Sequence, residues 1–192
     1  MARPYTLKRR AEQQAATRQR IVEATVELHG SVGPAQTTIS MIAERAGVQR
    51  HTFYAHFPDD RSLHMACSGL TLERDPLPDL SGWRDIADPG VRLRLGLREL
   101  YGWYERNAPL IACVLRDAEH HALTREICEL RFGPPMAYYR KLLSAGLTAE
   151  QRVLLPHALS FFTWRSLTGD CGLSESAAVA TMVRTVTGEA CP

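Results

Sequence analysis

The fold is decided by one stretch of the sequence, Thr37-Thr-Ile-Ser-Met-Ile-Ala-Glu-Arg-Ala-Gly-Val-Gln-Arg-His-Thr-Phe-Tyr-Ala-His-Phe57. Apolar residues in its first half recur at the i, i+3, i+4 and i+7 spacing of a helix face: Ile39, Ile42, Ala43 and Ala46. This spacing predicts a helix over residues 38–46 with Thr37 as its N-cap. Gly47 follows directly and tolerates the left-handed conformation that turns the chain. A second short helix is predicted over residues 50–57, which completes a helix-turn-helix.

The second of these helices keeps a polar face whose side chains suit the major groove of DNA. That face carries Gln49, Arg50, His51, Thr52, Tyr54 and His56. Arginine pairs with guanine, glutamine with adenine and a threonine methyl with thymine, while tyrosine hydroxyls and histidine rings reach phosphates. The pattern alone also fits two amphipathic helices of any helical protein, whose polar face meets only water.

Helical spacing recurs on both sides of this motif, so the sequence predicts an all-α protein. An earlier helix is predicted over residues 17–31, ending where Gly30 and Pro34 break the pattern. Residues 75–90 contain three prolines and two glycines and indicate a connection between domains. The predicted organisation is a basic arm at 1–16, a helix-turn-helix domain at 17–74, and a larger helical domain at 75–192.

Further helices are predicted in the second domain from caps and breaks. Asp88-Pro89 opens one helix, which is expected to be interrupted and restarted at residues 107–109. The next is expected to be broken at residues 133–135, where the break provides room and a hinge. Thr148 begins a capping box for a helix over residues 149–168, bent by Pro156, and the last helix opens at Ser174.

Composition and charge indicate a soluble globular protein with one basic end. The sequence is 45% hydrophobic and 23% charged, and no apolar run approaches the length of a membrane span. Residues 1–57 carry eight Lys or Arg against four Glu, whereas the remainder carries a net negative charge. The positive end favours a segment that meets phosphate. Five cysteines without a CxxC pair favour reduced thiols, and we expect a cytoplasmic protein because no secretory signal begins the chain.

The motif resembles the DNA-binding segment of the TetR family of transcriptional regulators over residues 17–66. The resemblance is carried by Thr37-Thr-Ile, Ile42-Ala-Glu-Arg-Ala-Gly-Val48 and Thr52-Phe-Tyr-Ala-His-Phe57, followed by Asp59 and Leu63. It implies a homodimeric, ligand-released repressor that binds a palindromic operator in double-stranded DNA. It also implies a phosphate contact from Thr38, backbone contacts from Tyr54 and His56, and base contacts from Arg50 and Thr52.

Three positions depart from the family's usual pattern: Gln49, His51 and Asp60. His51 puts a bulky ring where relatives approach the duplex closely. Asp60 removes a frequent phosphate contact, for which Arg61 is the expected substitute. The basic arm, with Lys8, Arg9 and Arg10, is expected either to contact phosphates or the minor groove or to remain a solvated tail.

The second domain is expected to bind an unidentified small effector and to form the dimer. Effector pockets between helices are mostly apolar with a few polar groups. The candidate lining residues are Tyr101, Trp103, Tyr104, His120, His121, Phe132, Met136, Tyr139 and Phe162, each of which also fits an ordinary core position. The resemblance implies that the last two long helices, 149–168 and 174–188, pair with their copies in a four-helix bundle.

Two other functional classes are weighed against DNA binding. Cys113, His121 and Cys128 recur at helical intervals and suggest a metal or nucleophile–base site together with Asp117 or Glu119. Chance placement explains them more simply, because no HExxH, GxSxG, P-loop or GxGxxG motif is present, so no enzyme, metal or cofactor is expected. The second alternative is a helical protein-interaction module without affinity for DNA.

Overall fold

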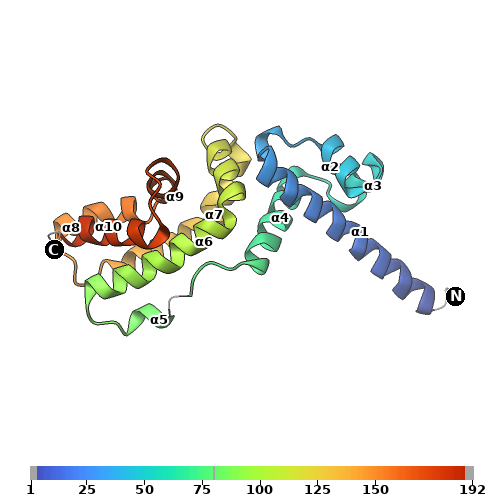
Figure 1. Ribbon diagram of the computed structural model, residues 1–192. Helices are drawn as coiled ribbons and strands as arrows, with labels where there is room; N and C mark the ends of the chain where they lie inside the picture. The colour runs from blue at the N-terminus through green and yellow to red at the C-terminus, as the bar shows by residue number, and fades with distance from the viewer. Residues whose placement is uncertain (1–3, 80, 189–192) are drawn as a thin grey trace. The chain divides into compact units, whose positions relative to one another are not determined.

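A computed structural model describes residues 4–79 and 81–188, and every regular element in this part of the chain is helical (Figure 1). The all-α prediction is therefore confirmed. The elements are α1 (Pro4–Ser31), η1 (Pro34–Gln36), α2 (Ile39–Ala46), α3 (Arg50–His56), α4 (Asp60–Arg74), α5 (Ser81–Arg84), α6 (Pro89–Ala118), α7 (Ala122–Leu143), α8 (Ala149–Ala158), α9 (Phe161–Arg165), the π-helical η2 (Ser166–Asp170) and α10 (Glu175–Thr187). None of the described helices is long and apolar enough to cross a membrane.

The chain divides into two compact units. Unit 1 contains the residues up to Pro76 together with Pro109–Arg131, and unit 2 contains Leu77–Ala108 and the chain from Phe132 onward. Residues 109–131, which the sequence assigns to the second domain, thus belong to the unit that holds the helix-turn-helix. Helices α6 and α7 each contribute residues to both units.

Helix caps fix most element boundaries where the sequence predicts them. Side-chain oxygens of Asp59, Thr148 and Ser174 accept hydrogen bonds from backbone N–H groups in the first turns of α4, α8 and α10. Thr148 and Gln151 form the predicted reciprocal capping box. Asp88 accepts from the N–H of Val91 at 2.8 Å at the start of α6.

Two predicted helix starts are wrong. Helix α2 is capped by Thr38, whose hydroxyl oxygen accepts a hydrogen bond from the N–H of Met41, and not by Thr37. The Thr37 hydroxyl instead donates to the carbonyl of Gly33 at 2.7 Å. Helix α1 begins at Pro4 and not near Thr17, so the described part of the predicted arm is helical. The first three residues of that arm lie outside the described residues.

The predicted helix breaks at prolines are also wrong. Helix α6 runs through Pro109, and α7 runs through Pro134 and Pro135, so neither helix is broken at these prolines. Pro109 and Pro134 are exposed, so water can satisfy carbonyl groups that lack an N–H partner. The predicted helix over 149–168 does break, between α8 and α9, where the Ser160 hydroxyl caps the new helix.

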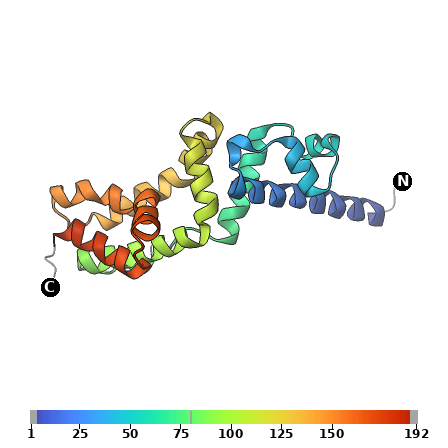
Figure 2. The same cartoon turned by 45° about the horizontal axis from the view of Figure 1, so that its top comes forward.

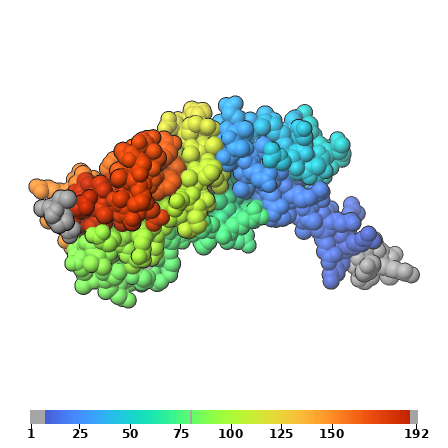
Figure 3. Space-filling view, in the orientation of Figure 1, coloured from blue at the N-terminus to red at the C-terminus, as the bar shows by residue number. Residues whose placement is uncertain are grey.

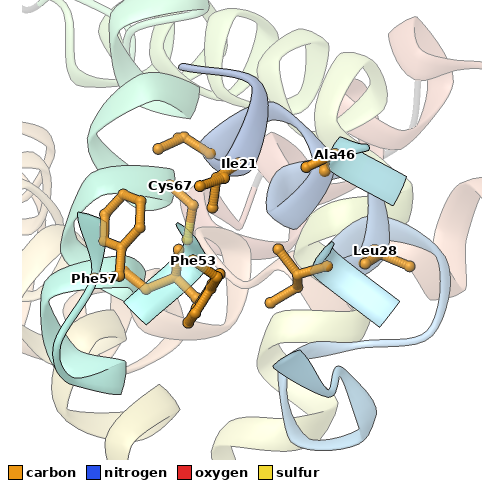
Figure 4. Packing of buried hydrophobic residues seen from close by; sticks show 10 residues of the cluster. Ile21, Leu28, Ala46, Phe53, Phe57 and Cys67 are labelled. Atoms are coloured by element: carbon orange, nitrogen blue, oxygen red, sulfur yellow. The ribbon is translucent and has the colours of Figure 1, made fainter. Parts of the chain in front are cut away.

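The core of unit 1 holds the helix-turn-helix on α1 and α4. Helix α1 packs against α2 and α4, and α2 packs against α3, as two views of the ribbon show (Figures 1 and 2). Buried side chains fill the space between these helices (Figure 4): Ile21, Val22, Ala24, Leu28, Ile42, Ala46, Phe53, Phe57, Leu63 and Cys67. Removing this apolar surface from water stabilises the arrangement by about 25 cal/mol for each Å² buried.

The core of unit 2 is rich in aromatic side chains. Tyr101 and Tyr104 of α6 are buried, and their hydroxyls donate to the carbonyls of Ala158 and Leu159 at 2.8 and 2.7 Å. Trp83 of α5 is fully buried and its indole N–H donates to Glu99 at 2.9 Å. These hydrogen bonds satisfy polar atoms that would otherwise make burial of the rings costly.

Candidate nucleic-acid interface

A glycine turn and two buried phenylalanines present α3 on unit 1. Gly47 adopts the left-handed conformation, with φ +63°, and its N–H bonds back to the last turn of α2. Phe53 and Phe57 are 2% and 1% exposed, so one side of α3 is anchored in the core. The predicted turn at Gly47 is confirmed, and the remaining side of α3 is left to face outward.

The outward side of α3 carries the six polar residues that the sequence singles out. Gln49, Arg50, His51 and Tyr54 are exposed, whereas Thr52 and His56 are half-buried. The Tyr54 ring packs edge-on against Phe53, with centroids 5.6 Å apart, while 47% of the residue remains exposed. The helix contains no acidic residue. The surface therefore combines donors with a positive charge, as a face that meets base edges and phosphates requires.

Thr38 and Arg61 are exposed, but each already has a partner within unit 1. The Thr38 hydroxyl oxygen serves as the α2 cap, and this bond does not use the hydroxyl hydrogen. The Arg61 guanidinium pairs with Glu126 of α7 at 2.9 Å, and both side chains are more than half exposed. An exposed ion pair is worth only about 0–1 kcal/mol, so exchange of Glu126 for a phosphate is energetically accessible.

The sequence does not predict the hydrogen bonds that join the end of α6 to the turn before α2. We call this contact, made by Arg116 and Asp117 with Val32 and Ala35, the latch. The buried Asp117 carboxylate accepts hydrogen bonds from the N–H of Ala35 and from Arg116, both at 2.8 Å. Arg116 also donates to the carbonyl of Val32 at 2.9 Å. Between them lies Gly33, with φ +98°, where a Cβ would collide with both side chains. Gly33 was the available signal, because a glycine can mark close backbone approach as well as a helix end.

Two buried imidazoles and a half-buried one form a row beside this latch. The rings of His29 and His64 are 5.1 Å apart, and those of His64 and His121 are 6.1 Å apart. Burial and repulsion from His64 lower the pKa of His29 to about 3, and burial also lowers the pKa of His64. These two histidines are therefore neutral at ordinary pH. Burial raises the pKa of the neighbouring Cys67 thiol to about 12, which keeps it protonated.

The thiol–imidazole alternative finds no support in the described part of the chain. Cys113 donates to the carbonyl of Gly30, and burial raises the pKa of Cys128 to about 11. Within residues 4–79 and 81–188, no group of three or more His, Cys, Asp or Glu side chains is arranged to hold a metal ion. Cys67, Cys113, Cys128 and Cys171 are unpaired, and Cys191 lies outside the described residues.

The candidate effector residues are divided between the two units. His120 and His121 belong to unit 1, whereas Tyr101, Trp103, Tyr104, Phe132, Met136, Tyr139 and Phe162 belong to unit 2. Within unit 2, Trp103 lies 6.0 Å from Phe132 and 5.9 Å from Tyr104 between ring centroids, and this group is largely core. Phe162 is 43% exposed on α9.

Unit 2 also has an open depression that involves only one of the predicted effector residues. It is lined by Leu77, Pro78, Asp79, Ser81, Arg84, Asp85, Pro135, Tyr138 and Tyr139. Arg84 donates to the Tyr138 hydroxyl at 2.8 Å, and the Tyr139 hydroxyl donates to the carbonyl of Pro78 at 2.7 Å. The proline and glycine content of the residues preceding α6 predicts a connection, and nothing in that pattern indicates that they line a hollow.

Comparison with known proteins finds similarity to one family of bacterial regulators. A family model described as bacterial regulatory proteins, tetR family, matches residues 21–63. The HTH-type transcriptional regulator TtgR of Pseudomonas putida is 30% identical over 128 residues, which are 65% of this chain. The chain is therefore similar to TetR-family regulators, and the family model covers its helix-turn-helix. The chain spans 60% of the length of TtgR.

Solved structures of TetR-type regulators share the fold across both units. The fatty acid degradation regulator FadR from Bacillus halodurans aligns with a TM-score of 0.65 and 18% identity, covering 90% of this chain and 95% of FadR. AibR, solved in complex with isovaleryl coenzyme A and operator DNA, aligns with a TM-score of 0.63 and 20% identity, covering 89% of this chain and 98% of AibR. The TetR-like architecture of a helix-turn-helix domain followed by a helical region is thus confirmed. All these proteins are regulators, which supports the expectation that the chain is not an enzyme.

Proposed function

We propose that this chain is a cytoplasmic transcriptional repressor of the TetR family that binds a palindromic operator as a homodimer and releases it when a small molecule binds. The observation that carries the proposal is the outward face of α3, with Gln49, Arg50, His51 and Tyr54 exposed above the buried Phe53. A polar, acid-free helix face held rigidly by a core is the geometry that reads the major groove.

The exposed residues divide between base reading and backbone contact. Arg50 donates to the O6 and N7 of a guanine, Gln49 pairs with an adenine, and the Thr52 methyl meets a thymine. Tyr54, His56, Thr38 and Arg61 hold phosphates and so fix the register of the helix. His51 is exposed on the same helix and meets the duplex beside Arg50.

Dimerisation is supported by apolar side chains left exposed on α8 and α9. Val153 is 77% exposed, Leu154 37% and Phe162 43%. Helix α8 packs against α10 within the protomer, so the segments 149–168 and 174–188 form a continuous candidate surface. Covering the exposed apolar groups with a second copy removes them from water. Two copies of α3 then read two half-sites one helical turn apart.

Effector binding is supported by the aromatic core of unit 2. Among the described residues, the buried indole N–H of Trp164 has no hydrogen-bond partner, and its ring lies 6.0 Å from that of Tyr104 between centroids. A buried donor without a partner carries a desolvation cost of about 1–3 kcal/mol, which a ligand carbonyl or carboxylate would remove. Release follows if the ligand prefers the conformation with lower DNA affinity.

Selection of bound duplexes from a random DNA pool tests the proposal. We expect an enriched palindrome with two half-sites separated by about ten base pairs between their centres. Absence of any retarded DNA at micromolar protein and low salt would instead favour the interaction-module alternative. All three tryptophans lie in unit 2, so quenching of intrinsic fluorescence by small molecules that release the duplex checks the effector site.

A further inference from the structure

We propose that the N-terminal part of α1, residues 8–20, is a second DNA-contacting surface that lies along the phosphates beside the duplex segment read by α3. The inference rests on the proposed DNA-binding function and adds a surface outside residues 21–63, the part matched by the family model. In place of an irregular basic arm, the DNA-contacting surface is then one face of a helix whose length is known.

This part of α1 is uncovered within the protein. From Lys8 to Arg20 every side chain is exposed except that of Thr17, which is half-buried, and the buried core begins at Ile21. The helix continues past α2 and α3 in both ribbon views, and no other segment covers it on the face seen in the space-filling view (Figures 1, 2 and 3). Residues 8–20 therefore leave almost their whole surface available to a partner.

The charge of the extension specifies a polyanionic partner. Residues 8–20 carry five basic side chains and one acidic one: Lys8, Arg9, Arg10, Arg18 and Arg20 against Glu12. The extension belongs to the same unit as α3, so the phosphates of a duplex bound there are the polyanion within reach. Arginine and lysine bind phosphates without reading sequence, so this surface adds affinity rather than specificity.

One face of the extension continues the face that packs inside unit 1. Counting back from the buried Ile21, helical spacing places Arg18, Gln14 and Arg10 at i−3, i−7 and i−11 on the same stripe. The Arg18 guanidinium lies 4.8 Å from the ring centre of Phe57, the C-cap residue of α3. The stripe thus begins at the end of α3. At 1.5 Å per residue it extends for about 20 Å, or about six base pairs.

The salt dependence of binding tests the charge of this surface. We compare the wild-type protein with the triple variant Lys8→Gln/Arg9→Gln/Arg10→Gln on the duplex recovered by selection. Each phosphate that is no longer neutralised makes the slope of log affinity against log salt shallower by about 0.9. Loss of the contact from Arg10, which lies on the stripe, therefore predicts a change of at least about 0.9 per protomer. The control Arg94→Gln/Arg140→Gln/Lys141→Gln removes equal charge from exposed positions of unit 2 outside the proposed dimer surface and should keep the wild-type slope.

Two single substitutions test the face. Gln14 lies on the proposed stripe, whereas the exposed Ala16 lies two residues away on the opposite side of the helix. Gln14→Glu places a negative charge against the phosphates and should weaken binding by about fivefold. Ala16→Glu should change affinity by less than about twofold. Equal reductions in affinity for the two variants would overturn the assignment of the face.

The outcomes separate this inference from the function on which it rests. If the wild-type protein retards neither the selected nor a random-sequence duplex at low salt, the proposed function fails. If it binds but the Lys8, Arg9 and Arg10 variant keeps the wild-type slope, only the role of the extension is overturned. A shallower slope together with an unchanged selected sequence supports it, because phosphate contacts carry no base specificity.

Discussion

The Asp117 carboxylate accepts a hydrogen bond from the N–H of Ala35 at 2.8 Å, across 82 positions of sequence. Asp117 lies at the end of helix α6, and Ala35 lies in the turn η1 that leads into the helix-turn-helix. Burial opposes ionisation of Asp117, but the hydrogen bonds from Arg116 and Ala35 outweigh it and hold the pKa of the carboxyl below its usual value. A charged latch therefore fixes the approach to α2.

Replacement of Asp117 should loosen unit 1 and weaken DNA binding. Asp117→Ala leaves the Ala35 N–H and the Arg116 guanidinium without their acceptor, so we expect a decrease of about 1–3 kcal/mol in the free energy of unfolding. Asp117→Asn keeps an acceptor but removes the charge, and its stability should fall between those of Asp117→Ala and the wild type. Urea unfolding measures the effect, with the exposed Asp170→Ala as control. A wild-type midpoint in Asp117→Ala would show that the latch contributes nothing.

Gly33 should tolerate no side chain. Gly33→Ala introduces a Cβ at φ +98° and against Arg116 and Asp117, so it should destabilise by more than about 1 kcal/mol. Gly82 provides the matched control, since it lies within α5 and a Cβ there would meet nothing within 4 Å. Gly82→Ala should stabilise by about 0.5–1 kcal/mol because alanine favours a helix. Thermal unfolding distinguishes the two, and equal shifts would contradict the close approach at Gly33.

Acidification should destabilise unit 1 through its buried histidines. The pKa of His29 is about 3 in the folded chain against about 6.5 unfolded, so the unfolded state binds the proton first. The contribution of His29 to the free energy of unfolding is fully present above about pH 6.5 and is lost as the pH drops toward about 3. At pH 5 the loss from His29 alone is about 2 kcal/mol. His29→Gln should flatten this dependence, whereas the exposed His120→Gln should not. Unfolding free energies measured between pH 8 and pH 5 provide the check; an unchanged profile in His29→Gln would refute it.

Charge placed on the exposed apolar surface of α8 and α9 should dissociate the dimer. Val153→Asp and Phe162→Asp each bury a carboxylate in the proposed interface, which is unfavourable without a partner. Light scattering on protein eluted from a size-exclusion column should show that the molar mass falls from that of two chains to that of one. Val91→Asp is the matched control, because Val91 is 55% exposed on α6, away from α8 and α9 in the sequence. Dissociation by Val91→Asp alone would locate the interface elsewhere.

The predictable parts of the structure are those set by local sequence. Gly47, Thr148 and Ser174 act through neighbours three or four residues away, and the local pattern predicts their caps and turns correctly. The apolar spacing from Ile39 to Ala46 likewise predicts the buried face of α2.

Three physical causes account for what the local sequence mispredicts, misses or leaves undecided. Prolines at Pro109 and Pro134 predict helix breaks, although at exposed positions water can satisfy the carbonyls that they leave unbonded. The latch from Asp117 to Ala35 and the imidazole row are long-range contacts, and no local spacing signals which distant residue will accept a hydrogen bond. Residue type is the only basis for the predicted effector residues, and it does not distinguish a core aromatic from one that lines a pocket.

The most direct test of the central claim compares the DNA sequences selected by wild-type protein and by Arg50→Ala. Arg50 is exposed on α3, while the control Arg45→Ala removes an arginine of α2 that pairs with Glu27 at 2.9 Å. We predict that the wild-type protein selects a palindrome with a guanine in each half. Arg50→Ala should lose the preference for guanine at that position and weaken binding by about 1–3 kcal/mol. Arg45→Ala should keep the preference. An Arg50→Ala motif identical to that of the wild type, bound with equal affinity, would contradict the assignment of α3 to the major groove.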